Sequence, residues 1–274
     1  MFNQLEILSD EQSEKLYTIR KYIKNLESAC IAYSGGVDST LVASLAFEQL
    51  GSKAVAITGI SPALANTLRE EARRQAKWIG VKHLEIKTSE LEQSSYSTNP
   101  KDRCFACKKE LHKHTTYLSR KLNYKIVLDG VNLDDLQDYR PGIQASRQAG
   151  VVSPLAKFKV SKKDIRDISR ALGFPWWDKP AQPCLSSRFP YGHEITSKRL
   201  KMVEKAEEYL KECGLTEVRV RCQGSTARIE IPQHELKNFF SKYNFSELVQ
   251  YFSNLGFNCT SLDLEGLVSG KLNR

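Results

Sequence analysis

Apolar residues follow two different spacings along the chain, and their succession predicts alternating strands and helices. In some stretches they recur every three or four positions, as on one face of an amphipathic helix, whereas short unbroken apolar runs are typical of buried strands. From the N-terminus the pattern predicts helix 10–26, strand 29–33, helix 38–50, strand 53–58, helix 63–79, strand 81–87, helix 104–122 and strand 125–129. Such alternation indicates an α/β fold with a doubly wound parallel sheet.

The pattern changes after a further predicted helix at 161–172, where proline and tryptophan gather in residues 175–183. Beyond this stretch the pattern predicts helix 196–213, strands 216–222 and 225–231, a helical region at 234–254 and strand 258–264. We therefore predict a larger α/β domain over residues 1–180 and a smaller C-terminal α+β domain over residues 181–274.

Composition and charge narrow the class of protein. The chain has 274 residues, of which 41% are hydrophobic and 27% charged, as in an ordinary globular protein. No apolar run is long enough to cross a bilayer and no signal peptide is evident, so we expect a cytoplasmic protein without a membrane partner. The net charge of +9 favours an anionic partner. Because the basic residues are dispersed and lack an aromatic-basic motif, a phosphorylated small molecule is favoured over nucleic acid.

A glycine-rich loop lies between the first predicted strand and the helix that follows it. Its residues are Ser34, Gly35, Gly36, Val37, Asp38, Ser39 and Thr40. Paired glycines let backbone N–H groups approach an anion, the helix directs its positive end to the same place, and the three hydroxyls can add donors. The loop lacks the Gly-Lys-Ser/Thr ending of a Walker A loop, so γ-phosphoryl transfer is not expected.

This loop resembles the ATP-binding signature of the PP-loop ATP pyrophosphatases. The resemblance implies that the loop holds the β,γ-pyrophosphate of ATP, that a nucleophile attacks the α-phosphate, and that pyrophosphate is released. The segment after Asp129, which contains Gly130, should converge on the loop because both follow carboxyl ends of parallel strands. Asp38, supported by Asp135, is a candidate ligand for a Mg²⁺ that bridges phosphate oxygens.

Seven cysteines in a chain without a secretory signal favour metal or redox chemistry over a disulfide framework. Cys104 and Cys107 stand three residues apart at the start of a predicted helix, and Cys184 adds a third thiol. A zinc site would need a fourth ligand, for which His112 and His114 are conceivable. Three thiolates suit a [4Fe-4S] cluster with one open iron, and a pair of reduced, packed cysteines is the simplest alternative. The other cysteines are assigned to structural packing: Cys30, Cys213, Cys222 and Cys259.

Four arginines form a candidate phosphate site. Arg219 and Arg221 are two residues apart on a predicted strand, hence on one face, and Arg228 on the next strand can join them. Arg188, in the loop that contains Cys184, can add another cation. The simpler interpretation is a set of strand arginines on a solvated face.

Motifs spread over nearly the whole chain resemble the LarE family of ATP-dependent sulfurtransferases. They are Asp129-Gly130, Asp138-Tyr139-Arg140-Pro141-Gly142, Cys184-Leu185-Ser186-Ser187-Arg188-Phe189-Pro190-Tyr191-Gly192, Val218-Arg219-Val220-Arg221, Ala227-Arg228-Ile229-Glu230, Leu262-Asp263-Leu264 and Ser269-Gly270. The resemblance implies sulfur insertion into pyridinium-3,5-biscarboxylic acid mononucleotide, a precursor of the nickel-pincer nucleotide cofactor. ATP would adenylate a carboxylate of this nucleotide substrate, and a protein-borne sulfur would displace AMP to give a thiocarboxylate.

The resemblance also bears on the source of the sulfur. Some family members sacrifice the sulfur of a single cysteine, whereas those with a CxxC pair and a later cysteine carry a cluster that accepts added sulfide. This chain has the second arrangement, which implies that Cys104, Cys107 and Cys184 hold an iron-sulfur cluster. Sulfide or a cysteine-derived donor would then supply the sulfur. We further expect a homo-oligomer, with the second domain serving substrate binding and assembly.

Other functions are compatible with the sequence. A PP-loop enzyme that thiolates tRNA shares the adenylation, the cysteines and often a cluster, although no added RNA-binding domain is evident. A PP-loop amide-forming synthetase shares the loop but has no need of three cysteines. A non-catalytic RNA-binding module is favoured only by the net charge of the chain.

Overall fold

The computed structural model describes residues 2, 4–137, 141–268 and 270–271. Four residues of the motifs above lie outside the described residues: Asp138, Tyr139, Arg140 and Ser269. The chain divides into two compact units. Unit 1 consists of Met1–Ser61, Asn66–Glu90 and Cys104–Gln182, and unit 2 of Pro62–Ala65, Leu91–Arg103 and Pro183–Arg274. Two short segments from the first half of the sequence therefore belong to unit 2, which a single boundary at residue 180 does not describe.

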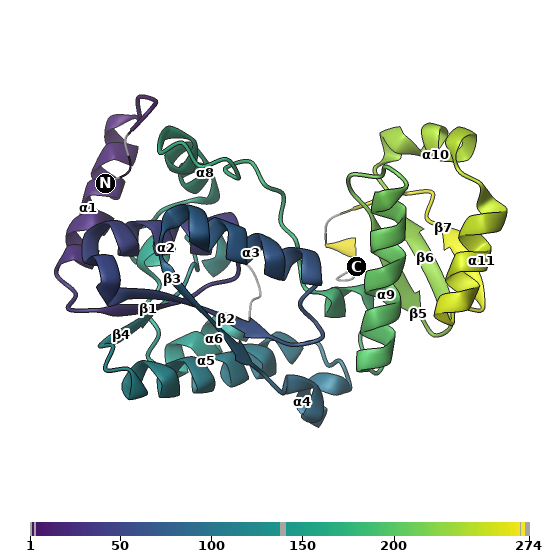
Figure 1. Cartoon of the computed structure of the whole chain (residues 1–274), viewed down its shortest axis with the longest axis horizontal. Coiled ribbons are helices and arrows are strands. Elements are labelled where there is room, and N and C mark those ends of the chain that lie inside the picture. The colour runs from purple at the N-terminus through teal and green to yellow at the C-terminus, as the bar shows by residue number, and fades with distance from the viewer. Residues whose placement is uncertain (1, 3, 138–140, 269, 272–274) are drawn as a thin grey trace. The chain divides into compact units, whose positions relative to one another are not determined.

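A four-stranded parallel sheet forms the centre of unit 1 (Figure 1). Its strands are β1 (Ala29–Ala32), β2 (Ala54–Ile60), β3 (Lys82–Lys87) and β4 (Ile126–Leu128), in the spatial order β3-β2-β1-β4. Ala29 pairs with Ala54 of β2 and with Ile126 of β4, so these three strands begin at the same level. The predicted α/β fold with a parallel sheet is confirmed.

Helices cover both faces of this sheet, as a doubly wound fold requires. On one face lie α1 (Asp10–Lys24), α2 (Val37–Leu50), α3 (Asn66–Ile79) and α8 (Lys162–Ala171), and on the other α5 (Arg103–Lys121) and α6 (Pro141–Gln148) (Figure 1). Shorter helices are η1 (Gly51–Lys53), η3 (Asp134–Leu136) and α7 (Pro154–Lys157). Among the described residues, no helix combines the length and the apolar character needed to span a membrane.

The alternation of side chains along β1 gives each face of the sheet its own core. All four residues of β1 are buried, as expected of a central parallel strand. Ala29 and Ile31 pack in the same apolar cluster as residues of α1, α2 and α8, whereas Cys30 packs on the opposite face with Val55 and Val127. Burial raises the pKa of the Cys30 thiol to about 11. Cys30 is therefore a packed, protonated thiol, as predicted.

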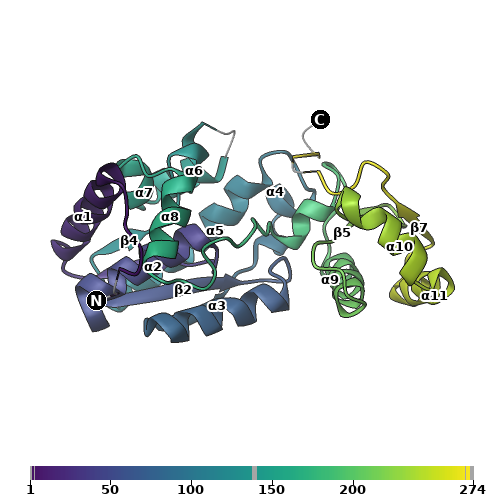
Figure 2. The ribbon, with the colours of Figure 1, turned by 90° about the horizontal axis from the view of Figure 1, so that it is seen from above.

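A smaller mixed sheet forms the centre of unit 2. β5 (Arg219–Gln223) and β6 (Thr226–Glu230) are antiparallel, and β7 (Cys259–Leu262) pairs with β6 in parallel. α9 (Ser197–Glu212) packs on β5, and α11 (Phe245–Leu255) packs on β7 and α9 (Figure 2). Shorter helices are η2 (Glu90–Glu92), α4 (Ser94–Ser97), η4 (Leu185–Arg188), η5 (Gln233–Glu235) and α10 (Leu236–Lys242).

Unit 2 also corrects part of the sequence analysis. The first strand begins at Arg219, three residues later than predicted. Cys222 is buried as expected, but Cys213 and Cys259 are exposed, so the prediction that both pack as small apolar residues is wrong. Cys213 is the C-cap of α9 and Cys259 begins β7, at the edge of the sheet. The apolar character of the surrounding sequence does not reveal that both positions lie at the ends of their elements.

Candidate active site

The loop between β1 and α2 is held by its own hydroxyl groups. The Ser39 hydroxyl accepts from the backbone N–H of Ser34 at 3.2 Å and donates to the carbonyl of Gly36 at 3.1 Å, and the two serine hydroxyls lie 3.0 Å apart. Gly36 is the N-cap of α2, and no side chain of the described residues caps that helix. The first N–H groups of α2, at the positive end of its dipole, are thus suited to bind an anion.

Two glycines allow close packing of backbone around this loop. Gly35 has a φ of +72°, and a Cβ there would lie 3.0 Å from Cβ of Ala72 in α3. Gly130, just beyond β4, is tighter still, because a Cβ would lie 2.6 Å from the backbone N of Ser39 and 2.8 Å from its Cα. The chain after β4 therefore touches the first turn of α2.

The side chain of Thr40 faces the core rather than the surface of the loop. The residue is fully buried, and its hydroxyl donates to Oε1 of Gln75 at 3.0 Å. The same oxygen accepts from the Tyr33 hydroxyl at 3.0 Å, and burial raises the pKa of Tyr33, which keeps that hydroxyl protonated. Thr40 thus ties α2 to α3 behind the loop. Its hydroxyl does not add the donor to the loop surface that the sequence predicts.

Asp38, in the first turn of α2, forms an ion pair that the sequence analysis missed. Nζ of Lys162 lies 2.7 Å from each carboxylate oxygen of Asp38. Lys162 is the first residue of α8, whose N-cap Ser161 forms a capping box with Asp164. This capping signal places Lys162 in a first helical turn. Only the tertiary fold brings its ammonium to Asp38, which is 124 residues away in the sequence.

Asn132 links the two candidate Mg²⁺ ligands through its side-chain amide and its backbone N–H. Nδ2 of Asn132 donates to Asp38 at 3.5 Å, and Oδ2 of Asp135 accepts from the backbone N–H of Asn132 at 3.2 Å. Such carboxylates are oxygen donors of the kind that Mg²⁺ prefers. A metal ion bound here would replace the ammonium of Lys162 as the counter-charge of Asp38.

The three candidate cysteines are all accessible, but they belong to different units. Cys104 and Cys107 lie in the first turns of α5, on one face of the helix, and are exposed and half-buried respectively. Cys184 is exposed at the N-cap of η4. The first two belong to unit 1 and the third to unit 2. Within the described parts of the chain, no group of three or more His, Cys, Asp or Glu side chains is arranged to hold a metal ion.

The two histidines considered as zinc ligands have other partners. His112 is fully buried, and its Nε2 lies 2.8 Å from the hydroxyl of Ser146 in α6. Burial, reinforced by the charge of Lys108, lowers the pKa of His112 to about 4, so the ring is neutral near pH 7. Nε2 of His114 lies 2.8 Å from a carboxylate oxygen of Glu110, one turn away. This geometry favours packing and pairing over a zinc site.

Three of the four candidate phosphate-binding arginines are already paired with acids. Arg188 forms two hydrogen bonds with Glu207, of 2.8 and 3.0 Å. Arg221 donates to one oxygen of Glu230 at 2.9 Å, and Arg228 donates to the other at 3.1 Å. Both acids are buried, as are Arg188 and Arg221, so these are not arginines of a solvated face. They form a buried network of charge pairs.

Arg219 differs from the other three arginines. The register places Arg219 opposite Glu230 and Arg221 opposite Arg228, so all four side chains lie on one face of the sheet. Among the described residues Arg219 forms no ion pair, and burial, followed by the charges of Arg188 and Arg221, lowers its pKa. Arg219 is therefore the cation of this cluster best suited to receive an anion.

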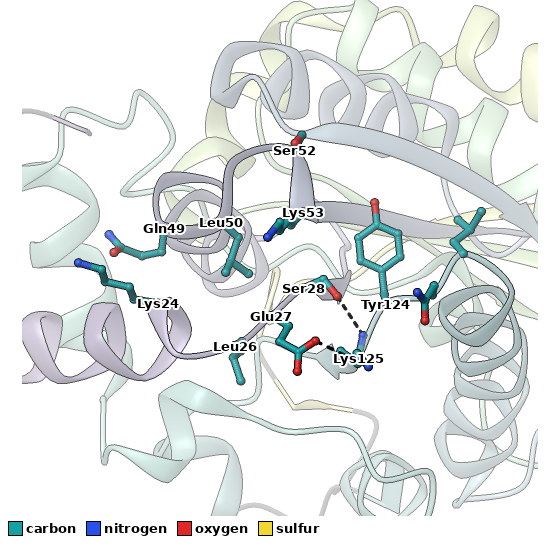
Figure 3. A pocket seen from close by; sticks show the side chains of 12 residues that line it. Lys24, Leu26, Glu27, Ser28, Gln49, Leu50, Ser52, Lys53, Tyr124 and Lys125 are labelled. Carbon is teal, nitrogen blue, oxygen red and sulfur yellow. Dashed lines mark hydrogen bonds and ion pairs between the residues drawn. The ribbon is translucent and has the colours of Figure 1, made fainter.

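A hollow at the opposite edge of the sheet is a weaker candidate (Figure 3). Its volume is about 590 Å³, and it lies where β1, β2 and β4 begin, beside the C-terminal ends of α1, α2 and α5. Its basic residues are Lys24, Lys53 and Lys125, and Lys125 pairs with Glu27 at 3.7 Å. Because the negative ends of three helix dipoles meet here, the lysines offset that field and leave little attraction for an anion. Ligands of parallel sheets bind at the other edge.

The chain is similar to several known proteins over most of its length. No protein-family model matches the chain. The chain is 53% identical over 260 residues to an uncharacterized protein of Synechocystis, covering 95% of this chain and 97% of that one. It is 33% identical over 261 residues to the pyridinium-3,5-bisthiocarboxylic acid mononucleotide synthase of Lactiplantibacillus plantarum, covering 94% of each. A chain of the glutamine-hydrolyzing GMP synthase of Archaeoglobus fulgidus is 21% identical over 71% of this chain and 67% of its own length.

A parallel sheet whose first strand leads through Ser-Gly-Gly into an uncapped helix, with an aspartate in the first turn, defines a PP-loop enzyme. Within this class, the chain belongs to the family of the pyridinium-3,5-bisthiocarboxylic acid mononucleotide synthases, because it matches that enzyme at 33% identity over nearly the full length of both. This is the LarE family, which the sequence motifs resemble.

Replacing Gly130 by alanine should disrupt the loop, because the new methyl group would lie 2.6 Å from the backbone N of Ser39. Overpacking of this kind costs about 1–3 kcal/mol, so the melting temperature should fall by several degrees. Gly59→Ala is the matched control, because its methyl group would meet side-chain atoms rather than backbone: Cδ1 of Leu111 at 2.8 Å and Cγ2 of Thr88 at 3.3 Å. Equal melting temperatures for the two variants would contradict the role given to Gly130.

Proposed function

We propose that the protein inserts sulfur into pyridinium-3,5-biscarboxylic acid mononucleotide in an ATP-dependent reaction, as a step of nickel-pincer nucleotide biosynthesis. The observation that carries this proposal is the 33% identity, over 94% of both chains, to an enzyme named for the bisthiocarboxylic product. An alignment of this extent includes both the loop of unit 1 and the arginines of unit 2.

ATP binds, in this proposal, at the loop between β1 and α2. The N–H groups at the start of α2 and the hydroxyls of Ser34 and Ser39 hold the β,γ-pyrophosphate, and Gly130 keeps the chain after β4 against them. A carboxylate oxygen of the substrate attacks the α-phosphorus, the bond to pyrophosphate breaks, and an acyl adenylate forms. The step converts a poor electrophile into a reactive one.

Asp38 would exchange its counter-charge if Mg²⁺ bound beside it. Asp38 and Asp135 would hold a Mg²⁺, which supplies positive charge to the departing pyrophosphate. The carboxylate oxygens of Asp38 that bind Lys162 at 2.7 Å would then turn to the metal. The ammonium of Lys162, released from Asp38, would bind a phosphate oxygen.

The sulfur comes, in this proposal, by way of the three accessible cysteines. Cys104, Cys107 and Cys184 would hold a [4Fe-4S] cluster, which supplies an open iron for added sulfide when it is bound. Sulfur attacks the carbonyl carbon of the acyl adenylate, the bond to AMP breaks, and a thiocarboxylate forms. Sulfide or a cysteine-derived donor restores the sulfur, so the enzyme turns over without losing a cysteine.

Arg219 binds the phosphate of the nucleotide substrate. It is the arginine of the cluster without an acidic partner among the described residues, and the charges of Arg188 and Arg221 beside it favour an anion. Glu207 and Glu230 hold the neighbouring guanidiniums in place, so the site is preorganised.

Assembly of several copies belongs to the proposal as well. Three apolar side chains of α10 and α11 are exposed, namely Phe240 at 57%, Phe245 at 39% and Val249 at 49%. The ring centres of Phe240 and Phe245 lie 5.9 Å apart, and neighbouring exposed apolar side chains are typical of surfaces that bind another protein. An amide-forming PP-loop synthetase is the second candidate function, favoured by the 21% identity to the GMP synthase chain.

Asp38→Asn should lower ATP-dependent pyrophosphate release by roughly 100-fold, because the carboxylate that would hold Mg²⁺ is lost. The assay uses Mg-ATP and the pyridinium substrate, with the thiocarboxylate followed by mass spectrometry. Asp10→Asn, in the first turn of α1, is the control and should keep full activity. Parallel reactions with ammonia and with bulk tRNA test the alternatives. Pyrophosphate release that depends on either of these instead of the pyridinium substrate would overturn the proposal.

Anaerobically purified protein should contain about four iron and four sulfide per chain, as a [4Fe-4S] cluster requires. Substituting Cys104, Cys107 or Cys184 by alanine should reduce both, whereas Cys213→Ala and Cys259→Ala should reduce neither. Metal analysis and the electronic spectrum measure the outcome. Protein without iron, or a mass loss of one hydrogen sulfide at Cys184 after one turnover, would instead indicate a sacrificial cysteine.

Arg219→Gln should raise the KM of the pyridinium nucleotide about 10–100-fold, the range expected for one lost charge-assisted hydrogen bond, and leave the KM of ATP unchanged. Its melting temperature should change little. Arg221→Gln is the contrasting variant and should melt earlier, because it removes one partner of the buried Glu230. An unchanged KM for the nucleotide in Arg219→Gln would exclude Arg219 as its phosphate ligand.

A further inference from the structure

Residues 183–195, here called the Cys184 loop, form hydrogen bonds with the 91–103 segment along much of the length of the loop. Both belong to unit 2. The hydroxyls of Tyr96 and Ser186 lie 2.6 Å apart in the core. The N–H of Ile195 donates to the carbonyl of Ser97 at 2.8 Å. Two parts of the chain that are far apart in sequence thus form one structure around the cysteine.

Asn99 makes most of the hydrogen bonds between the 91–103 segment and the second half of the Cys184 loop. Its Nδ2 donates to the carbonyls of Phe189, at 3.2 Å, and Pro190, at 2.7 Å. Its Oδ1 accepts from Arg103 at 2.9 Å, and its backbone carbonyl accepts from the N–H of Gly192 at 2.9 Å. Asn99 is fully buried, and its bonds to Phe189 and Arg103 are shielded from water. One side chain therefore fixes the path of the Cys184 loop.

The backbone of Asn99 limits which residues can take this role. Its φ of 56° lies in the left-handed region, which asparagine and glycine adopt more readily than other residues. Glycine would keep the backbone but remove all the side-chain bonds, and aspartate would keep the acceptor for Arg103 but offer no donor to the two carbonyls. The position therefore needs both the backbone freedom and the amide of asparagine.

The same segment leads directly into the cysteine pair. Arg103, which donates to Asn99, is 6% exposed, and its guanidinium lies 5.3 Å from the centre of the Tyr191 ring. The next residue is Cys104, so its Cα lies about 3.8 Å from that of Arg103. The contacts of Asn99 and Arg103 thus bind the Cys184 loop to the segment that precedes the cysteine pair in the sequence.

In the Cys184 loop, Cys184 itself is exposed, whereas several residues that follow it in the sequence are buried. Leu185, Ser186 and Phe189 are each at most 2% exposed, whereas Cys184 is exposed. The N–H of Leu185 donates to the carbonyl of Ala63, another residue of unit 2, at 2.9 Å. The backbone that carries Cys184 is therefore held by the buried residues that follow it.

We propose that Asn99 is a positioning residue that sets the presentation of the Cys184 thiol through the carbonyls of Phe189 and Pro190. The use of that thiol in sulfur transfer rests on the proposed function. The positioning itself depends only on contacts within unit 2, so the two can be tested separately.

The test compares Asn99→Gly with Asn123→Gly. Asn123 also has a positive φ, of 59°, but is exposed at the end of α5, so its replacement is a matched control for the backbone change. Alkylation by iodoacetamide is followed by peptide mass spectrometry at Cys184, Cys213 and Cys259, before and after anaerobic removal of iron. In Asn99→Gly the rate at Cys184 should change roughly tenfold, a factor that the loss of the two hydrogen bonds to the carbonyls of Phe189 and Pro190 allows. The rates at the other two cysteines should stay unchanged.

A second readout separates positioning from folding. In Asn99→Gly, kcat for thiocarboxylate formation should fall roughly tenfold, with the KM of ATP close to that of Asn123→Gly and a lower melting temperature but a single cooperative unfolding transition. If Asn99→Gly does not fold, Asn99→Asp carries the same comparison, because it keeps the acceptor for Arg103. Equal Cys184 alkylation in the Asn99 and Asn123 variants would overturn the proposal. If the wild-type protein forms no thiocarboxylate, but Cys184 alkylation still differs between Asn99→Gly and Asn123→Gly, only the proposed function is overturned.

Discussion

The contact between the backbone of Gly130 and the first turn of α2 is the constraint on which the loop of unit 1 depends. β1 and β4 are neighbours in the sheet, and each continues at its carboxyl end toward the same place. With a Cβ position only 2.6 Å from the backbone N of Ser39, any side chain at residue 130 would separate the two continuations. The hydrogen bond from Asn132 to Asp38 would be lost with them, because Asn132 is two residues beyond the glycine. The absence of a side chain at Gly130 therefore allows the loop and the acidic residues beside it to pack closely together.

Both sites share a way of handling charge. The carboxylate of Asp38 is paired with Lys162, and the buried arginines of unit 2 are paired with Glu207 and Glu230. Burying an arginine without an acid would be strongly destabilising, so the acids are a condition for placing guanidiniums in the interior. The consequence is selectivity for the ligand. Most charged side chains are fixed in ion pairs with each other, and few can bind a ligand in place of a protein group.

The features predicted from the sequence are those with local causes. The apolar run of β1, the Gly-Gly turn after it and the period-two spacing of Arg219 and Arg221 each follow from the geometry of one strand or turn. The pairing of Asp38 with Lys162 joins residues 124 positions apart, and no local pattern carries that information. Glu230 is different, because it stands two residues after Arg228 on the same strand face, so a local pattern does indicate it as a counter-ion. Thr40 follows Ser39, which belongs to the loop, so the sequence predicts that its hydroxyl also faces the loop. Successive side chains of a helix point in different directions, and the side chain of Thr40 points into the core.

The division of the chain into interleaved units has a consequence for biosynthesis. Pro62–Ala65 and Leu91–Arg103 leave the ribosome long before Pro183–Arg274, yet all three belong to the same unit. The buried amide of Asn99 cannot find its partners until the residues near Phe189 have been made. During translation these two early segments therefore remain without their unit 2 partners until Pro183–Arg274 has been synthesised.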